Sequence, residues 1–130
     1  MTEPLILDSG ALLALRRRSS GVWALLDRAQ RAKAPVLVPA GVLAQTARGG
    51  PRDRDINAVL GRDGTVVSAH DEERARSAGW LLGRAGMSDA VDALVVAEAL
   101  RHPSATIVTS DPNDIATLAH GYRRVKVVRV

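Results

Sequence analysis

Short apolar segments alternate along this chain with longer segments whose apolar residues recur at helical spacing. The first apolar segment, at 5–7, is continuous, as in a short strand that is buried on both faces. Similar segments follow at 35–39, 65–68, 106–109 and 125–130. The second is bounded by prolines, which strand ends tolerate, and the third is rich in β-branched residues. The pattern predicts five short strands.

The segments between these strands are predicted to be helical. They cover 9–15, 22–33, 40–48, a polar-to-apolar stretch that ends at Leu60, 71–85, 89–100 and 112–120. Gly86 is placed to end one helix and Ser88 to cap the next. Short apolar strands separated by helices are typical of an α/β fold. We expect an α/β/α sandwich with a five-stranded parallel sheet and right-handed crossovers.

Composition narrows the kind of core that the chain can build. With 130 residues, 46% of them hydrophobic, the chain is expected to form a single domain over 1–130. Aromatic residues make up only 2%, and Phe is absent. The core must therefore consist of Leu, Val, Ile and Ala, which favours close packing of helices on a sheet.

Cysteine content and hydropathy indicate in which cellular compartment the protein is expected. The sequence has no Cys, which excludes disulfides, thiolate metal sites and a cysteine nucleophile. No apolar run approaches the roughly 20 residues that span a bilayer, and no basic region precedes a signal-like core. These features predict a cytoplasmic protein with no membrane contact.

The charge is basic and carried by arginine. The formal net charge is +4, the pI is about 10.6, and only Lys33 and Lys126 among the 18 basic residues are lysines. Guanidinium groups suit bidentate contacts with phosphate, so nucleic acid is a candidate partner. The run at 16–18 has a simpler interpretation as a solvated helix end, where the helix dipole favours cations.

Five aspartates recur where strands end or helices begin. Asp8 follows the first strand, Asp111 and Asp114 follow the fourth, and Asp89 and Asp92 open the helix before it. The carboxyl ends of parallel strands share one edge of the sheet, and residues three apart lie on one helix face, so these side chains can converge. Each aspartate alone could instead be a helix cap or a complement to the helix dipole.

A converging set of carboxylates predicts a cation site. Like charges a few ångströms apart repel and raise each other's pKa, so folds rarely gather them without a neutralising cation. Carboxylate oxygens favour Mg²⁺ or Mn²⁺, which such sites hold through a few carboxylates together with waters and substrate phosphate.

Three stretches resemble PIN-domain ribonucleases, and among these the VapC-like toxins of VapBC (type II) toxin–antitoxin pairs. They are Leu-Asp-Ser-Gly-Ala-Leu-Leu-Ala-Leu from position 7, Ser-Asp-Ala-Val-Asp-Ala-Leu-Val-Val-Ala-Glu-Ala from 88, and Thr-Ser-Asp-Pro-Asn-Asp-Ile from 109. The resemblance extends over essentially the whole chain. It implies the PIN-like sheet, an Mg²⁺ or Mn²⁺ cofactor, and an endoribonuclease in which metal-activated water attacks an RNA phosphodiester.

The resemblance also assigns roles and partners. Asp8, Asp92 and Asp111 match the core catalytic and metal-binding acids of the family, and Asp89 and Asp114 match auxiliary metal positions. The implied partners are an RNA substrate, a second copy of the chain in a homodimer, and a cognate antitoxin protein.

One position departs from the family pattern. The family usually has a Glu on the helix after the second strand, where this chain has Gln45. A Gln offers a neutral carbonyl ligand and lacks the formal charge, which puts a second metal ion or the activity itself in doubt. The alternative function is therefore a catalytically weakened PIN fold that binds RNA or protein.

Other residues that could carry chemistry receive simpler interpretations. The three histidines, His70, His102 and His120, match no metal-ligand spacing and are expected at the surface or in loops. Trp23 and Trp80 lie at helical core spacing, which favours packing or an interface over base stacking.

Two other sheet-based classes fail on particular residues. A receiver domain needs an acidic pair after the first strand and a phosphoacceptor Asp after the third, but Asp8 is single and the sequence 68–70 is Ser-Ala-His. A haloacid-dehalogenase-like phosphatase needs a second Asp two residues after the first, and that position is Gly10.

Overall fold

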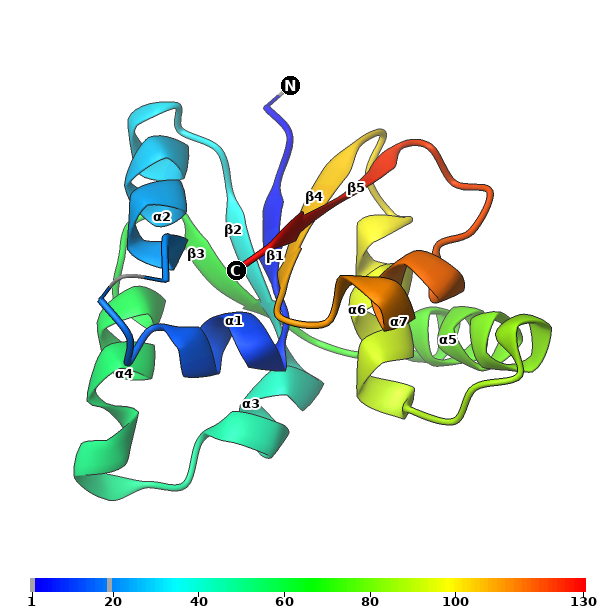
Figure 1. Cartoon of the computed structure of the whole chain (residues 1–130), viewed down its shortest axis with the longest axis horizontal. Coiled ribbons are helices and arrows are strands. Elements are labelled where there is room, and N and C mark those ends of the chain that lie inside the picture. The colour runs from blue at the N-terminus through cyan, green and yellow to red at the C-terminus, as the bar shows by residue number, and fades with distance from the viewer. Residues whose placement is uncertain (1, 19) are drawn as a thin grey trace.

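Five parallel strands form the sheet at the centre of the molecule (Figure 1). The computed structural model describes residues 2–18 and 20–130. The strands lie in the order β3-β2-β1-β4-β5, and each neighbouring pair is parallel. Their bounds are β1 Leu5–Leu7, β2 Val36–Pro39, β3 Thr65–Ser68, β4 Ala105–Thr109 and β5 Val125–Arg129.

Helices cover both faces of this sheet. Their bounds are α1 Ser9–Ala14, α2 Val22–Arg31, α3 Ala40–Thr46, α4 Arg54–Leu60, α5 Glu72–Ala85, α6 Ala90–Ala99 and α7 Pro112–Leu118, with a 3-10 helix, η1, at Gly50–Asp53. The chain adds β2 and β3 on one side of β1 and then returns to add β4 and β5 on the other. In Figure 1, α2 and α4 lie on one side of the sheet, and α5, α6 and α7 lie on the other. The predicted α/β class and five-stranded parallel sheet are confirmed.

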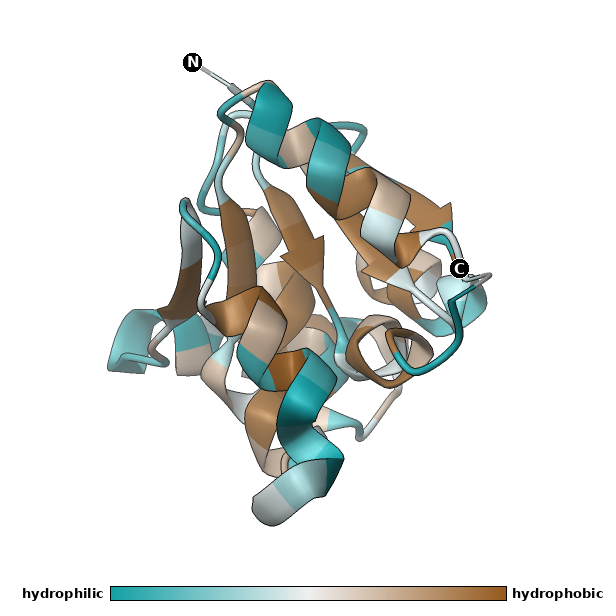
Figure 2. Ribbon diagram, turned by 90° about the vertical axis from the view of Figure 1, so that its left-hand side faces the viewer, coloured by the Kyte–Doolittle hydropathy of each residue, from teal (hydrophilic) through white to brown (hydrophobic). Residues whose placement is uncertain are grey.

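The core is aliphatic, as the composition requires. Ile6, Leu7, Ile107 and Leu118 are fully buried, and the strands are brown along the middle of Figure 2 while the outer helix faces are teal. No helix within residues 2–18 and 20–130 is long and apolar enough to cross a membrane. Burial of the central strands on both faces leaves their carboxyl ends as the polar edge of the sheet.

One local prediction needs correction, and one turn contains a feature that the sequence did not indicate. The cap of α6 is Asp89 rather than Ser88, because the Asp89 carboxylate accepts a hydrogen bond from the backbone N–H of Asp92 at 3.1 Å. The turn after α3 forms η1, because the buried Asp53 carboxylate accepts hydrogen bonds from the backbone N–H groups of Arg48 and Gly49, at 3.0 and 2.8 Å. Both features depend on a side chain that satisfies backbone donors at a helix end or turn.

The two tryptophans differ. Trp23 packs partly buried against the core, and its indole N–H donates to the Leu15 carbonyl at 3.0 Å. Trp80 is 58% exposed, so core packing is the wrong interpretation for this residue. Its ring lies against the guanidinium of Arg84, 5.1 Å from the ring centroid, on the solvent side of α5.

Candidate functional site

Asp8 lies where β1 ends and α1 begins. Its backbone N–H donates to the Val108 carbonyl of β4 at 3.2 Å, and its carboxylate accepts the Ala11 backbone N–H at 2.9 Å. Asp8 is therefore the N-cap of α1, and it is only 4% exposed. Burial raises the pKa of the Asp8 carboxyl, against the hydrogen bonds that favour its ionised form. Capping and membership of an acidic site are compatible, because a carboxylate has two oxygens.

The loop after β4 is held against the start of α1. Ser110 packs so closely on Gly10 that a Cβ at Gly10 would lie 2.7 Å from the Ser110 Cβ and overlap its hydroxyl. The buried Thr109 hydroxyl accepts the Asp111 backbone N–H at 2.9 Å. These contacts place Asp111 near Asp8, and the Asp111 charge contributes to the raised Asp8 pKa.

The pKa of Asp92 depends on the charges of the other four predicted acids. Asp92 lies half-buried in the first turn of α6, one helical turn from Asp89. Its pKa is raised to about 6, first by burial and then by the charges of Asp89, Asp8, Asp114 and Asp111. These acids come from β1, α6 and the β4–α7 segment, which lie far apart in the sequence. The structure therefore brings the five predicted carboxylates into one cluster.

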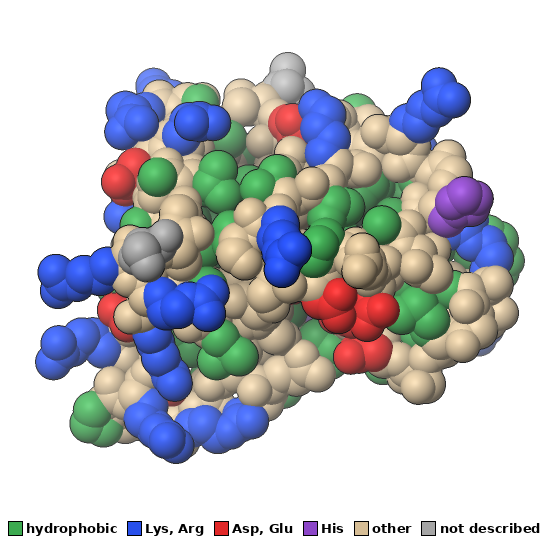
Figure 3. Space-filling view, viewed as in Figure 1, with side chains coloured by type: hydrophobic (Ala, Val, Ile, Leu, Met, Phe, Trp, Pro, Cys, Tyr) green, Lys and Arg blue, Asp and Glu red, His purple; other side chains and the backbone are tan. Residues whose placement is uncertain are grey.

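The fifth acid shares a hydrogen bond with its neighbour. Asp114 lies in the first turn of α7, and a side-chain hydrogen bond with Asp111 is the largest cause of its raised pKa, followed by the Asp111 charge. Figure 3 shows acidic side chains gathered in one patch on this face, where the starts of α6 and α7 lie in Figure 1. We call the cluster of Asp8, Asp89, Asp92, Asp111 and Asp114 the acidic cluster.

The chemistry of the acidic cluster suits a hard divalent cation. Within the described residues, no group of three or more His, Cys, Asp or Glu side chains is placed so that all of them could hold one metal ion. The mutual repulsion expressed in the Asp92 pKa is what a cation would relieve. Mg²⁺ keeps several waters and uses only one or two carboxylates directly, so the residues fit Mg²⁺ or Mn²⁺ without a complete protein cage.

Gln45 lies beside the acidic cluster. Its side-chain carbonyl accepts a hydrogen bond from the hydroxyl of Ser9, the residue that follows Asp8. Gln45 is exposed near the end of α3, and α3 packs against α1. The position at which the sequence departs from the family pattern is therefore adjacent to the predicted acids.

The sequence prediction gave no role to Thr109 or Ser110, and it placed His70 at the surface or in a loop; His70 does lie in a loop, half-buried. Thr109 and Ser110 hold the β4–α7 loop, and His70 accepts the Gly41 backbone N–H through Nε2 at 2.9 Å, at the start of α3. The signal for the first two was the Thr-Ser pair directly before Asp111. Nothing in the local sequence singles out His70, because its partner is 29 positions away.

The remaining histidines lie away from the acidic cluster. His120 is exposed in a turn, as predicted. His102 lies in a loop but is half-buried, with Nε2 3.4 Å from the Glu98 carboxylate. Glu98 is 2% exposed, and its other oxygen is 3.4 Å from Arg74 Nε. This group joins α5 to α6 and has the character of a structural ion-pair network.

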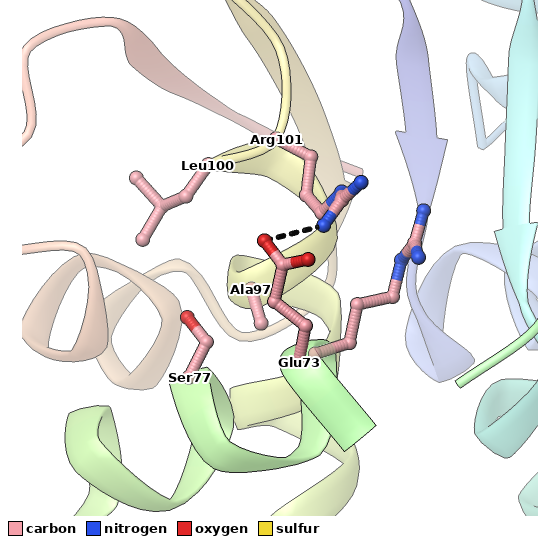
Figure 4. Close-up of a pocket in the computed structure, with 6 residues that line it drawn as sticks. Glu73, Ser77, Ala97, Leu100 and Arg101 are labelled. Atoms are coloured by element: carbon pink, nitrogen blue, oxygen red, sulfur yellow. Dashed lines mark ion pairs between the residues drawn. The ribbon is translucent and has the colours of Figure 1, made fainter. Parts of the chain in front are cut away.

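A pocket of about 340 Å³ between α5 and α6 is separate from the acidic cluster (Figure 4). Glu73 and Arg101 line it and form an ion pair at 2.8 Å. The other lining residues are Arg74, Ser77, Ala97 and Leu100. None of the predicted site residues lines this pocket, and each of its charged groups is in an ion pair: Glu73 with Arg101, and Arg74 with Asp71 and Glu98.

Comparison with solved structures identifies the fold. A chain of the crystal structure of VapBC2 from Rickettsia felis bound to a DNA fragment from their promoter is similar to this chain, with a TM-score of 0.69. The match covers 98% of both chains at 12% sequence identity. No protein-family model matches the sequence, and no curated protein sequence matches it. At this level of identity the similarity concerns the fold, and the PIN-like architecture is confirmed.

Proposed function

We propose that this protein is an Mg²⁺- or Mn²⁺-dependent endoribonuclease with a PIN-like fold. The observation that carries the proposal is the gathering of five carboxylates from separate elements around Asp92, whose pKa is raised to about 6 first by burial and then by the charges of the other four. Asp8 is buried, Asp92 and Asp114 are half-buried, and Asp89 and Asp111 are exposed. Gathering these five acids costs stability unless the cluster serves a cation or a reaction. Its location at the carboxyl edge of a parallel sheet is the usual ligand position in open α/β folds.

The five aspartates would have different roles, according to where they lie in the acidic cluster. Asp8, Asp92 and Asp111 would hold the metal ion, and Asp89 and Asp114 would add negative charge from the first turns of their elements. When bound, Mg²⁺ or Mn²⁺ supplies charge for a phosphodiester and lowers the pKa of a water molecule. The Ala11 N–H and Thr109 keep the Asp8 and Asp111 segments in place. RNA is the substrate that this proposal requires.

The deciding experiment is cleavage of RNA by the purified chain with added Mg²⁺ or Mn²⁺. Cleavage should depend on the metal and disappear with Asp8→Asn, because Asn keeps the capping oxygen but loses the charge. Asp71→Asn is the matched control, since Asp71 caps α5 in the same way and is not among the acids that act on Asp92. Metal-independent cleavage, or full activity in Asp8→Asn, would contradict the proposal.

The alternative function is a PIN-like module that binds RNA or protein with weakened catalysis. Gln45 supports this alternative, because the exposed amide beside Ser9 brings no charge to the acidic cluster. RNA binding without any metal-dependent cleavage by the wild-type chain is the result that would favour the module over the enzyme.

We also propose that the protein acts as a toxin, is neutralised by a cognate antitoxin protein and forms a homodimer in the cytoplasm. The similar fold of a chain in the VapBC2 structure and the net charge of +4, which favours an acidic partner segment, support this assignment. Light scattering at tens of micromolar should give the mass of a dimer, and expression of the chain alone should arrest its host. A monomer argues against the dimer, and harmless expression argues against the toxin role.

A further inference from the structure

We propose that an arginine lobe beside the acidic cluster binds the phosphate backbone of single-stranded RNA. The inference rests on the proposed ribonuclease function and adds the surface that holds the substrate. Two short segments build the lobe, one after α1 and one between α3 and α4. Its members are Arg16, Arg17, Arg18, Arg48, Arg52 and Arg54.

The two segments of the arginine lobe are joined to each other. Arg16 Nη2 donates to the Arg52 carbonyl at 3.4 Å. Arg48 donates to the carbonyls of Ala44 and Gln45 at the end of α3, at 3.2 and 2.9 Å, which orients its guanidinium. The buried Asp53 carboxylate binds backbone N–H groups and shapes the turn that presents the neighbouring arginines. These contacts join the two segments and hold the side chains of Arg16 and Arg48.

The arginine lobe carries an excess of positive charge, although the buried Asp53 carboxylate interacts electrostatically with Arg16 and Arg48. All six side chains are exposed, and none makes an ion pair with any other described residue within 4.0 Å. Arg16, Arg18 and Arg54 line a hollow of about 610 Å³ together with Leu15, Trp23 and one acid, Asp55. Figure 3 shows Lys and Arg side chains gathered on the side of this face away from the acidic patch.

The lobe is connected to the acidic cluster through α1. Asp8 caps the start of α1, and Arg16 follows its end. Eight residues at about 1.5 Å each separate the two by about 12 Å. At about 3.4 Å per nucleotide, a stacked strand covers that distance in roughly four nucleotides. The neutral pair of Ser9 and Gln45 lies beside the start of this path.

Electrostatics favours RNA as the occupant. The acidic cluster repels a polyanion, so a substrate that must deliver one phosphate there needs cationic anchors for its neighbouring phosphates. Exposed guanidinium groups bind phosphate oxygens in bidentate geometry, and they tolerate any base sequence. An acidic protein segment is the other occupant that this charge would attract, and the experiment below distinguishes it from RNA.

The test measures binding without cleavage. A fluorescent single-stranded RNA of 12 nucleotides is titrated in EDTA, so that binding does not depend on the metal ion or on catalysis. The variant carries Arg17→Gln, Arg18→Gln and Arg54→Gln, three side chains without hydrogen bonds to described residues in the structure. We expect affinity to fall about 10-fold or more. The salt slope of log K should fall by about 2, because each phosphate that a cationic side chain neutralises on a single strand contributes about 0.7 to that slope.

The matched control carries Arg28→Gln, Arg31→Gln and Lys33→Gln. It removes the same charge from exposed positions at the end of α2, by the opposite edge of the sheet. Affinity of the control should stay within about twofold of the wild type. The inference is overturned if both triple variants lose RNA affinity equally, or if the lobe variant keeps the RNA affinity of the wild type. Poly-glutamate serves as a model of an acidic protein segment. A lobe variant that loses affinity for poly-glutamate but not for RNA also overturns the inference. If RNA binding needs the lobe but the chain shows no metal-dependent cleavage, the proposal for the lobe stands and the proposed ribonuclease function is rejected.

Discussion

The Ser9 hydroxyl donates a hydrogen bond to the Gln45 side-chain carbonyl, across 36 positions of sequence. Because Ser9 follows Asp8, this bond places Gln45 at the edge of the acidic cluster. After burial, the charge of Asp89 is the largest cause of the raised Asp92 pKa, and we expect this charge to replace the one that a Glu at position 45 would bring.

We expect Gln45→Glu to change Mg²⁺ affinity and cleavage rate little, because a further carboxylate joins a crowded cluster and adds repulsion. Asp89→Asn should weaken Mg²⁺ affinity, since Asp89 lies one helical turn from Asp92. Titration of Mg²⁺ against RNA cleavage in the three proteins measures both effects. A gain of several-fold from Gln45→Glu together with no loss from Asp89→Asn would show that nothing replaces the missing Glu.

Asn substitutions at the three core acids should separate activity from folding. Asp8→Asn, Asp92→Asn and Asp111→Asn should each abolish RNA cleavage while the chain stays folded, because each removes a metal ligand and also removes repulsion. Cleavage assays and circular dichroism on the same samples check the prediction. Wild-type cleavage by all three variants would refute the site assignment.

The raised pKa of Asp92 predicts how stability changes with pH. Folding favours the protonated carboxyl, so the resulting stabilisation is present at acidic pH and is lost as pH rises from the ordinary value of 3.8 through about 6. At pH 7 without metal, Asp92→Asn should therefore raise the free energy of unfolding by about 1–2 kcal/mol. Urea unfolding at pH 5 and pH 7 measures the effect.

Asp71→Asn is the control for this measurement. Hydrogen bonding to the Arg74 backbone lowers the pKa of Asp71, so its stabilisation is present above pH 3.8 and is lost as pH falls further. Asp71→Asn should lower stability slightly at pH 7, the opposite sign from Asp92→Asn. The same sign in both variants would contradict the proposed repulsion within the acidic cluster.

The contact between Gly10 and Ser110 predicts a rescue experiment. Gly10→Ala should lower the free energy of unfolding by about 1–3 kcal/mol and reduce cleavage, because the new Cβ collides with Ser110 and displaces the segment that carries Asp111. The double variant Gly10→Ala with Ser110→Gly should recover much of the lost stability and much of the lost cleavage activity. Thermal unfolding and cleavage assays report the two quantities.

Gly79→Ala is the control for this prediction. A Cβ at Gly79 in α5 would meet nothing within 4 Å, so alanine there should stabilise the protein by about 0.5–1 kcal/mol through its better helix propensity. A stabilising Gly10→Ala would show that the β4–α7 loop adapts freely.

Much of this protein is determined locally by its sequence. The continuous apolar segment at β1 predicts a strand, because a strand that is buried on both faces has apolar residues at every position. The helical spacing after it predicts a helix, because a helix that is buried on one face has apolar residues only every three or four positions. The alternation of such segments was sufficient to predict the parallel sheet. Asp8 and Asp111 were predicted to share its carboxyl edge because parallel strands end together there.

Tertiary contacts decided the remaining features. The exposed ring of Trp80 and the half-buried position of His102 depend on which side chains fill the neighbouring space, and the local pattern does not encode this. The Asp92 pKa depends on carboxylates from three separate elements. The arginine lobe likewise depends on the packing of α1 beside α3, which brings two modest runs of arginine into one basic surface. Electrostatic interactions act through space, so their strength is set by the fold that brings the charges together.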